Sequence, residues 1–266
     1  MRTLSVQMSR QTGDGHVRPR NGFTLIEIAV GLLILSLLFA ALLSLIPVQI
    51  EQRRIAETQN GLTQISEALM GFAMSKGYLP CPDKTSDTPA GGAKNDGTED
   101  VKADGTCIVP EGNLPWVTLG IPSSDAWGRV FHYRVTAAFA NRSPSPLFKL
   151  DSAGTLTICS TAAVSSTCPP TAPTIPPIPA TTYSTSAPAV ILSYGKNGYG
   201  GIVNIAYTTL PAPTSADEIE NTNGNAFFVS RTLTAVGAPV GEFDDLVSWI
   251  STPVLMSRMV SAQKLP

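Results

Sequence analysis

The sequence predicts an α+β fold in which a long N-terminal helix packs on an antiparallel β-sheet head that ends in short helices. Three observations predict this fold. Residues 28–48 form an apolar segment without a charged residue, and a polar segment with regularly spaced apolar residues follows it. The rest of the chain consists of short β-prone runs separated by turn residues. With 266 residues, the chain is long enough to bury a sizeable core.

Composition and charge exclude several classes of function. The chain is 43% hydrophobic and 14% charged, with a net charge of −2, which argues against disorder and against strong nucleic-acid binding. Only two histidines, His16 and His132, are present, so a zinc site built on several imidazoles is excluded. No Gly-x-Ser-x-Gly elbow accompanies His132, which we expect on a strand. The sequence therefore predicts a protein that is not an enzyme.

The N-terminal segment predicts a processed membrane anchor. Residues 1–22 carry four arginines and one aspartate, and this positive leader favours a cytoplasmic N-terminus. Gly22 precedes the apolar run, so cleavage after it would keep residues 23–48, which are long enough to span a bilayer as a helix. Glu27 needs a cationic partner at the edge of this run, and a new amino group on Phe23 would supply one. In the alternative interpretation, the segment is a plain signal anchor with Glu27 in the headgroup region.

The six residues Gly22-Phe23-Thr24-Leu25-Ile26-Glu27, followed by an apolar run, resemble the processing and methylation motif of type IV pilins and type II secretion pseudopilins. The resemblance implies that a prepilin peptidase cleaves between Gly22 and Phe23, that Phe23 is N-methylated, and that Glu27 sets subunit register in a helical fibre. It implies three further partners: other pilin or pseudopilin subunits, an inner-membrane assembly platform and, before assembly, the lipid bilayer. The implied location is the inner membrane, with one span and a periplasmic head, and then the fibre.

The size of the head favours a minor subunit of such a fibre. Asp125-Ala126-Trp127-Gly128 is similar to a turn of the major pseudopilins, but the Pro-rich loop and the long C-terminal extension are unlike their compact heads. A different class of function remains as an alternative. In that case the chain is a non-polymerising, membrane-anchored periplasmic binding or adhesive protein, with Trp116 and Trp127 on its ligand surface.

An amphipathic helix is predicted to continue from the apolar segment to Lys76. Gly77 and Pro80 are typical of a helix end, and Pro47 predicts a kink near residues 43–47. The apolar face that packs on the head comprises Ile55, Leu62, Ile65, Leu69 and Phe72. The predicted divisions are a cleaved leader at 1–22, a transmembrane and fibre-core helix at 23–48, an amphipathic helix at 49–76 and a globular head at 77–266.

The head is predicted to contain short strands, one long loop and two C-terminal helices. Residues 169–189 hold seven prolines and predict an extended surface loop, while Gly195 to Gly201 predict a turn rather than a phosphate-binding loop. Helical spacing over residues 243–250 predicts one helix, and Pro253 opens a second that ends near Lys264. The predicted strands are 116–119, 130–135, 147–150, 155–159, 189–193, 202–207 and 226–229.

Four cysteines fall in the part of the chain that we expect to be exported to an oxidising compartment. Two disulfides are therefore predicted. The local pairings Cys81 with Cys107 and Cys159 with Cys168 are favoured over the crossed ones, because each would close one irregular loop.

Acidic residues gather among glycines in the loop between the first two cysteines. Carboxylate oxygens on a flexible backbone are ligands that calcium prefers, although the spacing matches no EF-hand. Two interpretations are open: a solvated acidic loop, or a calcium site with Asp83, Asp96 and Asp100 as ligands. Calcium is the one cofactor considered, and some pseudopilins of the family that the motif resembles bind it in a head loop.

Overall fold

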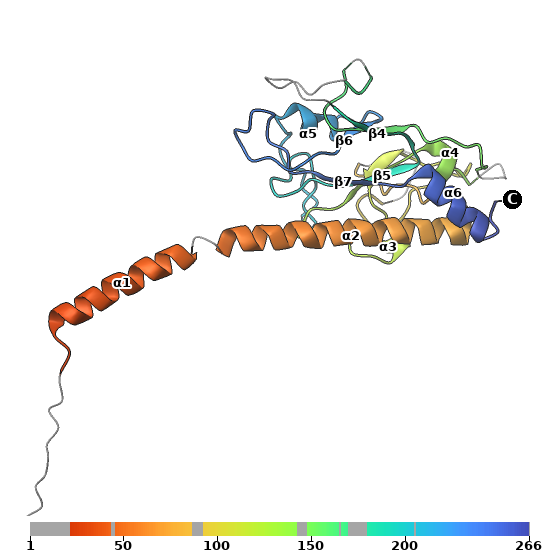
Figure 1. Ribbon diagram of the computed structural model, residues 1–266. Helices are drawn as coiled ribbons and strands as arrows, with labels where there is room; N and C mark the ends of the chain where they lie inside the picture. Colours follow the sequence, from red (N-terminus) through yellow and green to blue (C-terminus); the bar gives the residue numbers. More distant parts are fainter. Residues whose placement is uncertain are drawn as a thin grey trace, which may run out of the picture. The chain divides into compact units, whose positions relative to one another are not determined.

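The computed structural model describes residues 22–43, 46–86, 93–142, 148–164, 166–169, 180–204 and 206–265. The chain divides into two compact units, Met1–Ile50 and Glu51–Pro266. The first unit contains helix α1 and the first turn of helix α2, and the second contains the rest of α2 and every strand of the described residues (Figure 1).

The N-terminal helix is divided in the first unit. Helix α1 spans Leu25–Leu43, and α2 spans Ile46–Lys76. Pro47 lies in the first turn of α2, where its missing N–H costs nothing because that position has no intrahelical acceptor. The prediction of an interruption near residues 43–47 is confirmed.

In the second unit, α2 packs one face on the head. Leu62, Ile65 and Leu69 are at most 4% exposed, and Ile55 packs against the same core at its edge. The helix ends where the sequence predicts. The Gly77 N–H donates to the Ala73 carbonyl at 2.7 Å, and Gly77 has a φ of 89°, the left-handed conformation of a helix C-cap.

A four-stranded antiparallel sheet lies against α2 (Figure 1). Its order is β1 (Glu111–Asn113), β2 (His132–Val135), β5 (Ala189–Ser193) and β7 (Leu246–Trp249). Tyr133, Val135 and Ile191 of this sheet share one core with the buried face of α2. The predicted packing of a helix on an antiparallel sheet is confirmed.

A second sheet covers the opposite face of β5. It has the order β4 (Thr182–Ala187), β3 (Leu156–Cys159) and β6 (Phe227–Val229). One pair in it, β3 with β6, is parallel, which the antiparallel prediction did not include. Val190 and Leu192 pack here with Ile158 and Phe228, so every residue of β5 is buried and the head has three layers.

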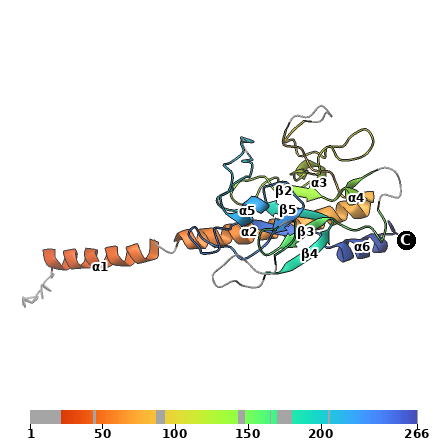
Figure 2. The same ribbon diagram turned by 90° about the horizontal axis from the view of Figure 1, so that it is seen from above.

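Four short helices complete the described part of the head: α3 (Trp116–Leu119), α4 (Ala137–Ala140), α5 (Ala216–Glu220) and α6 (Thr252–Ser261). Helix α6 is the one predicted to begin at Pro253. It lies beside α2, where Arg258 donates hydrogen bonds of 2.7 and 2.9 Å to Glu67 (Figure 2).

Two predicted elements have the wrong type. Residues 116–119 form helix α3 instead of a strand, because Pro115 precedes them and Gly120 ends them in a left-handed cap with a φ of 68°. Residues 246–249 form strand β7 instead of a helix. The helical spacing came from Phe243, Leu246, Val247 and Ile250. In the strand, Leu246 packs in the core beside α2, and Val247 and Trp249 pack on the opposite face, while antiparallel pairing with β5 holds the extended conformation.

Other predictions fail in part. Residue 147 lies outside the described residues, and 148–150 form no strand. Ile202 makes only an isolated bridge, to Thr209, and residue 205 is not described. The predicted loop 169–189 contains β4, whose Thr and Ser residues pair with β3 despite their polarity, while residues 170–179 lie outside the description.

Candidate processing and assembly site

The segment that the sequence singled out lies at the start of α1. Gly22, Phe23 and Thr24 precede the helix, which begins at Leu25, and Phe23 is 77% exposed. The Gly22–Phe23 peptide bond therefore lies in a non-helical, exposed stretch. Residues 1–21 are outside the described part of the chain.

Thr24 and Glu27 cap the helix reciprocally. The Glu27 N–H donates to the Thr24 hydroxyl oxygen at 3.3 Å, and the Thr24 N–H donates to the Glu27 carboxylate in a long bond of 3.5 Å. This is a capping box, in which the Glu27 carboxylate accepts the N–H of the N-cap residue and the Thr24 hydroxyl shares the Glu27 N–H with the Thr24 carbonyl, which accepts it at 3.1 Å. The carboxylate also lies in the first turn, where the helix dipole favours negative charge. Sequence reasoning missed the role of Thr24, although the Thr-x-x-Glu spacing indicates it.

Beyond the cap, α1 carries apolar side chains on all sides. Leu25 is 89% exposed, Ile26 72% and Leu32 61%. Ser36 donates its hydroxyl to the Leu33 carbonyl at 2.8 Å, so its polar group is satisfied within the helix. An apolar surface of this extent is typical of a helix that lipid or other apolar side chains cover. Among the described residues, no helix combines the length and the apolar character that crossing a membrane requires.

Comparison with known proteins agrees with this geometry. Residues 17–43 match a family model described as the prokaryotic N-terminal methylation motif. This motif is the leader signature of type IV pilins and pseudopilins, and it supports a structural subunit of that type. It implies processing by prepilin peptidase and assembly with other pilin subunits. The chain matches no curated protein and no solved structure.

The four cysteines form the two local disulfides that the sequence favoured. Cys81 bonds to Cys107, and Cys159 bonds to Cys168, with Cα–Cα distances of 5.3 and 5.7 Å. The first bond ties the chain just after α2 to the loop before β1. The second closes a short loop after β3. Both stabilise irregular segments of the head rather than line a reactive site.

The described residues show no metal site at the three predicted calcium ligands. Within the described residues, no three Asp, Glu, His or Cys side chains form a group that could hold a metal ion. Asp83 and Asp100 are buried and accept backbone N–H bonds, from Gly97 at 2.9 Å and from Lys84 at 2.8 Å. Asp96 accepts two bonds from Thr98 instead. Two of these carboxylates thus organise the loop from within, so the description of a solvated acidic loop does not hold for them, and the calcium site stays a prediction.

Burial has an electrostatic consequence in this loop. Desolvation raises the pKa of Asp83 from 3.8 to about 7, and the nearby Asp96 and Asp100 add to the increase. The backbone hydrogen bond from Gly97 opposes it without cancelling it. Asp83 therefore gains a proton far more readily than an exposed aspartate does.

A second acid, the partly buried Asp244, holds the glycine-rich turn after β5. Asp244 accepts the Asn197 N–H at 2.7 Å, and Glu218 accepts the Asn197 side-chain amide at 3.2 Å. Desolvation raises the pKa of Asp244 to about 7. Gly195 and Gly198 have φ values of 57° and 68°, so the predicted turn with positive φ is confirmed.

Proposed function

We propose that the chain is a minor structural subunit of a type IV pilus or a type II secretion pseudopilus, without enzymatic activity of its own. Prepilin peptidase cleaves it between Gly22 and Phe23, and Phe23 is then N-methylated. Residues 23–48 hold it in the inner membrane, with residues 77–266 as a periplasmic head. An inner-membrane platform then moves it from the lipid bilayer into the fibre, where it contacts other subunits through α1.

One observation carries this proposal: the capped start of α1, two residues after the peptide bond to be cut and directly before an apolar helix surface. The exposed bond suits a peptidase. The apolar surface suits lipid first and neighbouring helices afterwards. The head is larger than the compact heads of major pseudopilins and carries a Pro-rich segment. Both features support a minor position, because the principal subunit is repeated along the whole length of the fibre.

Glu27 has a distinct role in this account. In the uncleaved chain its carboxylate caps its own helix. Cleavage creates an ammonium group on Phe23, and Glu27 then pairs with that of its own or a neighbouring subunit, which compensates both charges in the apolar fibre core. Subunits that are out of register would leave a carboxylate and an ammonium group unpaired.

Incorporation into fibres tests this role. Glu27→Gln keeps a residue that can complete a capping box but removes the charge, so we expect normal cleavage and a strong decrease in the fibre fraction. Glu51→Gln is the matched control, because Glu51 makes only a 4.0 Å ion pair with Lys196. Both variants should be co-expressed with the prepilin peptidase and the other fibre components, and the chain measured in sheared fibres and in membranes. Normal incorporation of Glu27→Gln would refute the pairing role, and a cleaved wild-type chain that never enters fibres would favour the non-polymerising alternative.

A further inference from the structure

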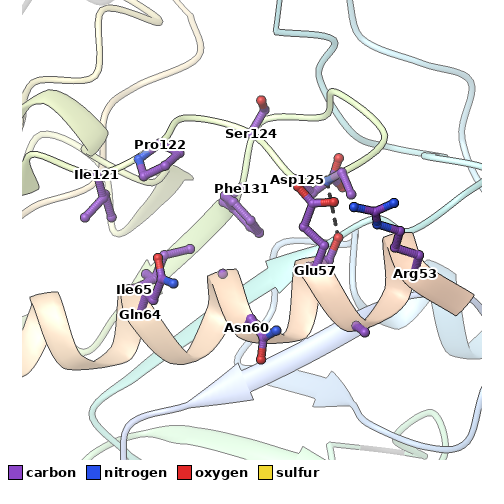
Figure 3. Close-up of a pocket in the computed structure, with 14 residues that line it drawn as sticks. Arg53, Glu57, Asn60, Gln64, Ile65, Ile121, Pro122, Ser124, Asp125 and Phe131 are labelled. Carbon is purple, nitrogen blue, oxygen red and sulfur yellow. Dashed lines mark hydrogen bonds between the residues drawn. The ribbon is translucent and has the colours of Figure 1, made fainter.

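The head contains a pocket of about 600 Å³ between α2 and residues 121–126 (Figure 3). Its volume lies within the range of about 300–1,000 Å³ that is typical of small-molecule sites. The proposed fibre function depends on the start of α1 and does not involve this pocket. All its lining residues belong to the second compact unit.

The walls of the pocket are fixed before any ligand arrives. Thr58 of α2 is 1% exposed, and its hydroxyl accepts the Ala126 N–H at 3.3 Å. Asp125 accepts the backbone N–H groups of Trp127 and Arg129, both at 2.9 Å, and the Ser193 hydroxyl at 2.6 Å. These hydrogen bonds hold the loop on α2 and on strand β5, so a ligand would not have to order it on binding.

The base of the pocket is apolar and contains a helix glycine. Ile65 and Phe131 are each 2% exposed, and Ile121 and Pro122 continue the apolar surface. Gly61 lies inside α2, where glycine costs about 1 kcal/mol relative to alanine. A Cβ on it would meet the Phe131 ring at 3.5 Å, an ordinary contact, so packing does not require glycine here. The missing side chain instead keeps the pocket open.

One face of α2 lines the pocket with polar groups. Arg53, Glu57, Asn60 and Gln64 follow one another at steps of four, three and four residues. Within the described part of the chain, none of these four side chains makes a hydrogen bond or an ion pair. They offer guanidinium donors, carboxylate acceptors and two amides that both donate and accept.

We infer that this pocket binds a neutral, polyhydroxylated ligand of mono- or disaccharide size. Of the exposed charged side chains that line the pocket, Arg53 and Glu57 carry opposite charges. Asp125 also lines it, but its carboxylate is buried and already accepts three hydrogen bonds. An anion would therefore face Glu57 and Asp125, and a cation would face Arg53. Neighbouring hydroxyl groups both donate and accept, as the two amides do, and the C–H face of a sugar ring packs on the apolar base. An extended peptide would find no main-chain partners here, because a helix and a loop line the pocket and no strand edge of the described residues does.

Binding to defined disaccharides tests the inference. The full chain should be held in lipid nanodiscs, because sugar-based detergents would compete, and titrated with cellobiose, maltose and N,N′-diacetylchitobiose by calorimetry and saturation-transfer NMR. We expect saturable binding of at least one of them. The Asn60→Leu and Gln64→Leu variants should weaken it by about tenfold or more each, since each removes hydrogen bonds to the ligand.

Matched controls separate the pocket from the rest of the helix. Gln59→Leu changes an exposed glutamine outside the pocket and should bind as the wild type does. Gly61→Leu fills the pocket and should abolish binding, whereas Gly71→Leu places the same side chain where nothing lies within 4 Å of the new Cβ. Because Asn60 and Gln64 are exposed, their variants should fold even if Gly61→Leu does not.

Either of two results would overturn the inference. One is the absence of saturable binding of all three disaccharides up to about 20 mM, a limit that includes weak specific sites. The other is binding that Asn60→Leu and Gln64→Leu leave unchanged, which would place the sugar elsewhere. If the wild type binds no sugar and Asn60→Leu reduces crosslinking between copies of the chain, the pocket belongs to a contact between subunits.

Discussion

The Thr24 hydroxyl accepts the N–H of Glu27, and the Glu27 carboxylate accepts the N–H of Thr24, so two residues three apart fix where α1 begins. This pair lies directly after the bond that the proposed function requires to be cut. The cap keeps the cleavage point out of the helix and keeps the carboxylate satisfied until an ammonium group replaces its backbone partner. Helix start, peptidase access and later charge pairing thus depend on the same few atoms.

Removing the cap should loosen the first turn of α1. Thr24→Ala loses the hydroxyl acceptor, which is worth about 1 kcal/mol at a helix N-terminus. Amide hydrogen exchange of Glu27 and Ile28 in nanodiscs should then be several-fold faster than in the wild type. Ser36→Ala, which removes a hydroxyl that bonds inside the helix, should leave these two amides unchanged. Equal exchange in Thr24→Ala and the wild type would show that the capping box does not hold the helix start.

The two disulfides should differ in their contribution to stability. The Cys81–Cys107 bond spans 26 residues and Cys159–Cys168 spans 9. The chain-entropy model then assigns about 3.5 kcal/mol to the first and about 2.6 kcal/mol to the second. Each cysteine pair should be replaced by serines, and the free energy of unfolding of both variants measured in urea. The variant without Cys81–Cys107 should be the less stable one, and the full burial of Cys81 adds to its loss. The reverse order would contradict the assignment.

Stability should fall as the pH rises toward neutrality. Asp83 and Asp244 each have a pKa raised by burial from 3.8 to about 7. The folded state therefore binds protons more tightly than the unfolded state. Their contribution is complete below about pH 4 and is lost as the pH rises through about 7. Melting temperatures from about pH 4 to pH 8 should decrease by several degrees, and the Asp83→Asn/Asp244→Asn variant should flatten this profile. A profile that rises over this range in the wild type would contradict the sign.

Gly195 should tolerate substitution poorly. A Cβ there would lie 2.1 Å from the Asp244 carbonyl oxygen, on a backbone with a φ of 57°. Gly120 has a similar φ of 68°, but nothing lies within 4 Å of its Cβ position. Gly120→Ala should therefore cost about 1 kcal/mol from the backbone alone, and Gly195→Ala clearly more. Equal losses in urea unfolding would mean that Asp244 moves aside freely.

Local signals explain which parts of the fold the sequence predicts. The stripe of α2, its Gly77 cap, the cores of β3, β5 and β6, and helix α6 each depend on a short pattern of apolar or capping residues. Strand β1 has no such pattern, because Glu-Gly-Asn carries no apolar residue and is extended only through its pairing with β2 and, at Asn113, with Asp83. Strand β4 could not be recognised from the sequence, because it consists mostly of Thr and Ser residues. Strand β7 is predicted as a helix because of the apolar spacing around it.

The functional sites also differ in whether one short segment or two distant segments form them. The processing motif is contiguous, so it can be recognised without a structure. The pocket forms only where residues 53–65 of α2 meet residues 121–126, and no pattern within either segment indicates the other. The calcium prediction rested on composition alone and stays a prediction. The composition of the loop suggested ligands, but burial turned Asp83 and Asp100 toward backbone N–H groups.

The most direct test of the central claim is the intact mass of the chain after co-expression with a prepilin peptidase. We expect a product that begins at Phe23 and carries one additional methyl group on its N-terminus. A catalytically inactive peptidase provides the control and should leave the chain whole. A chain that stays uncut beside the active enzyme, or that is cut at any bond other than Gly22–Phe23, would contradict the account.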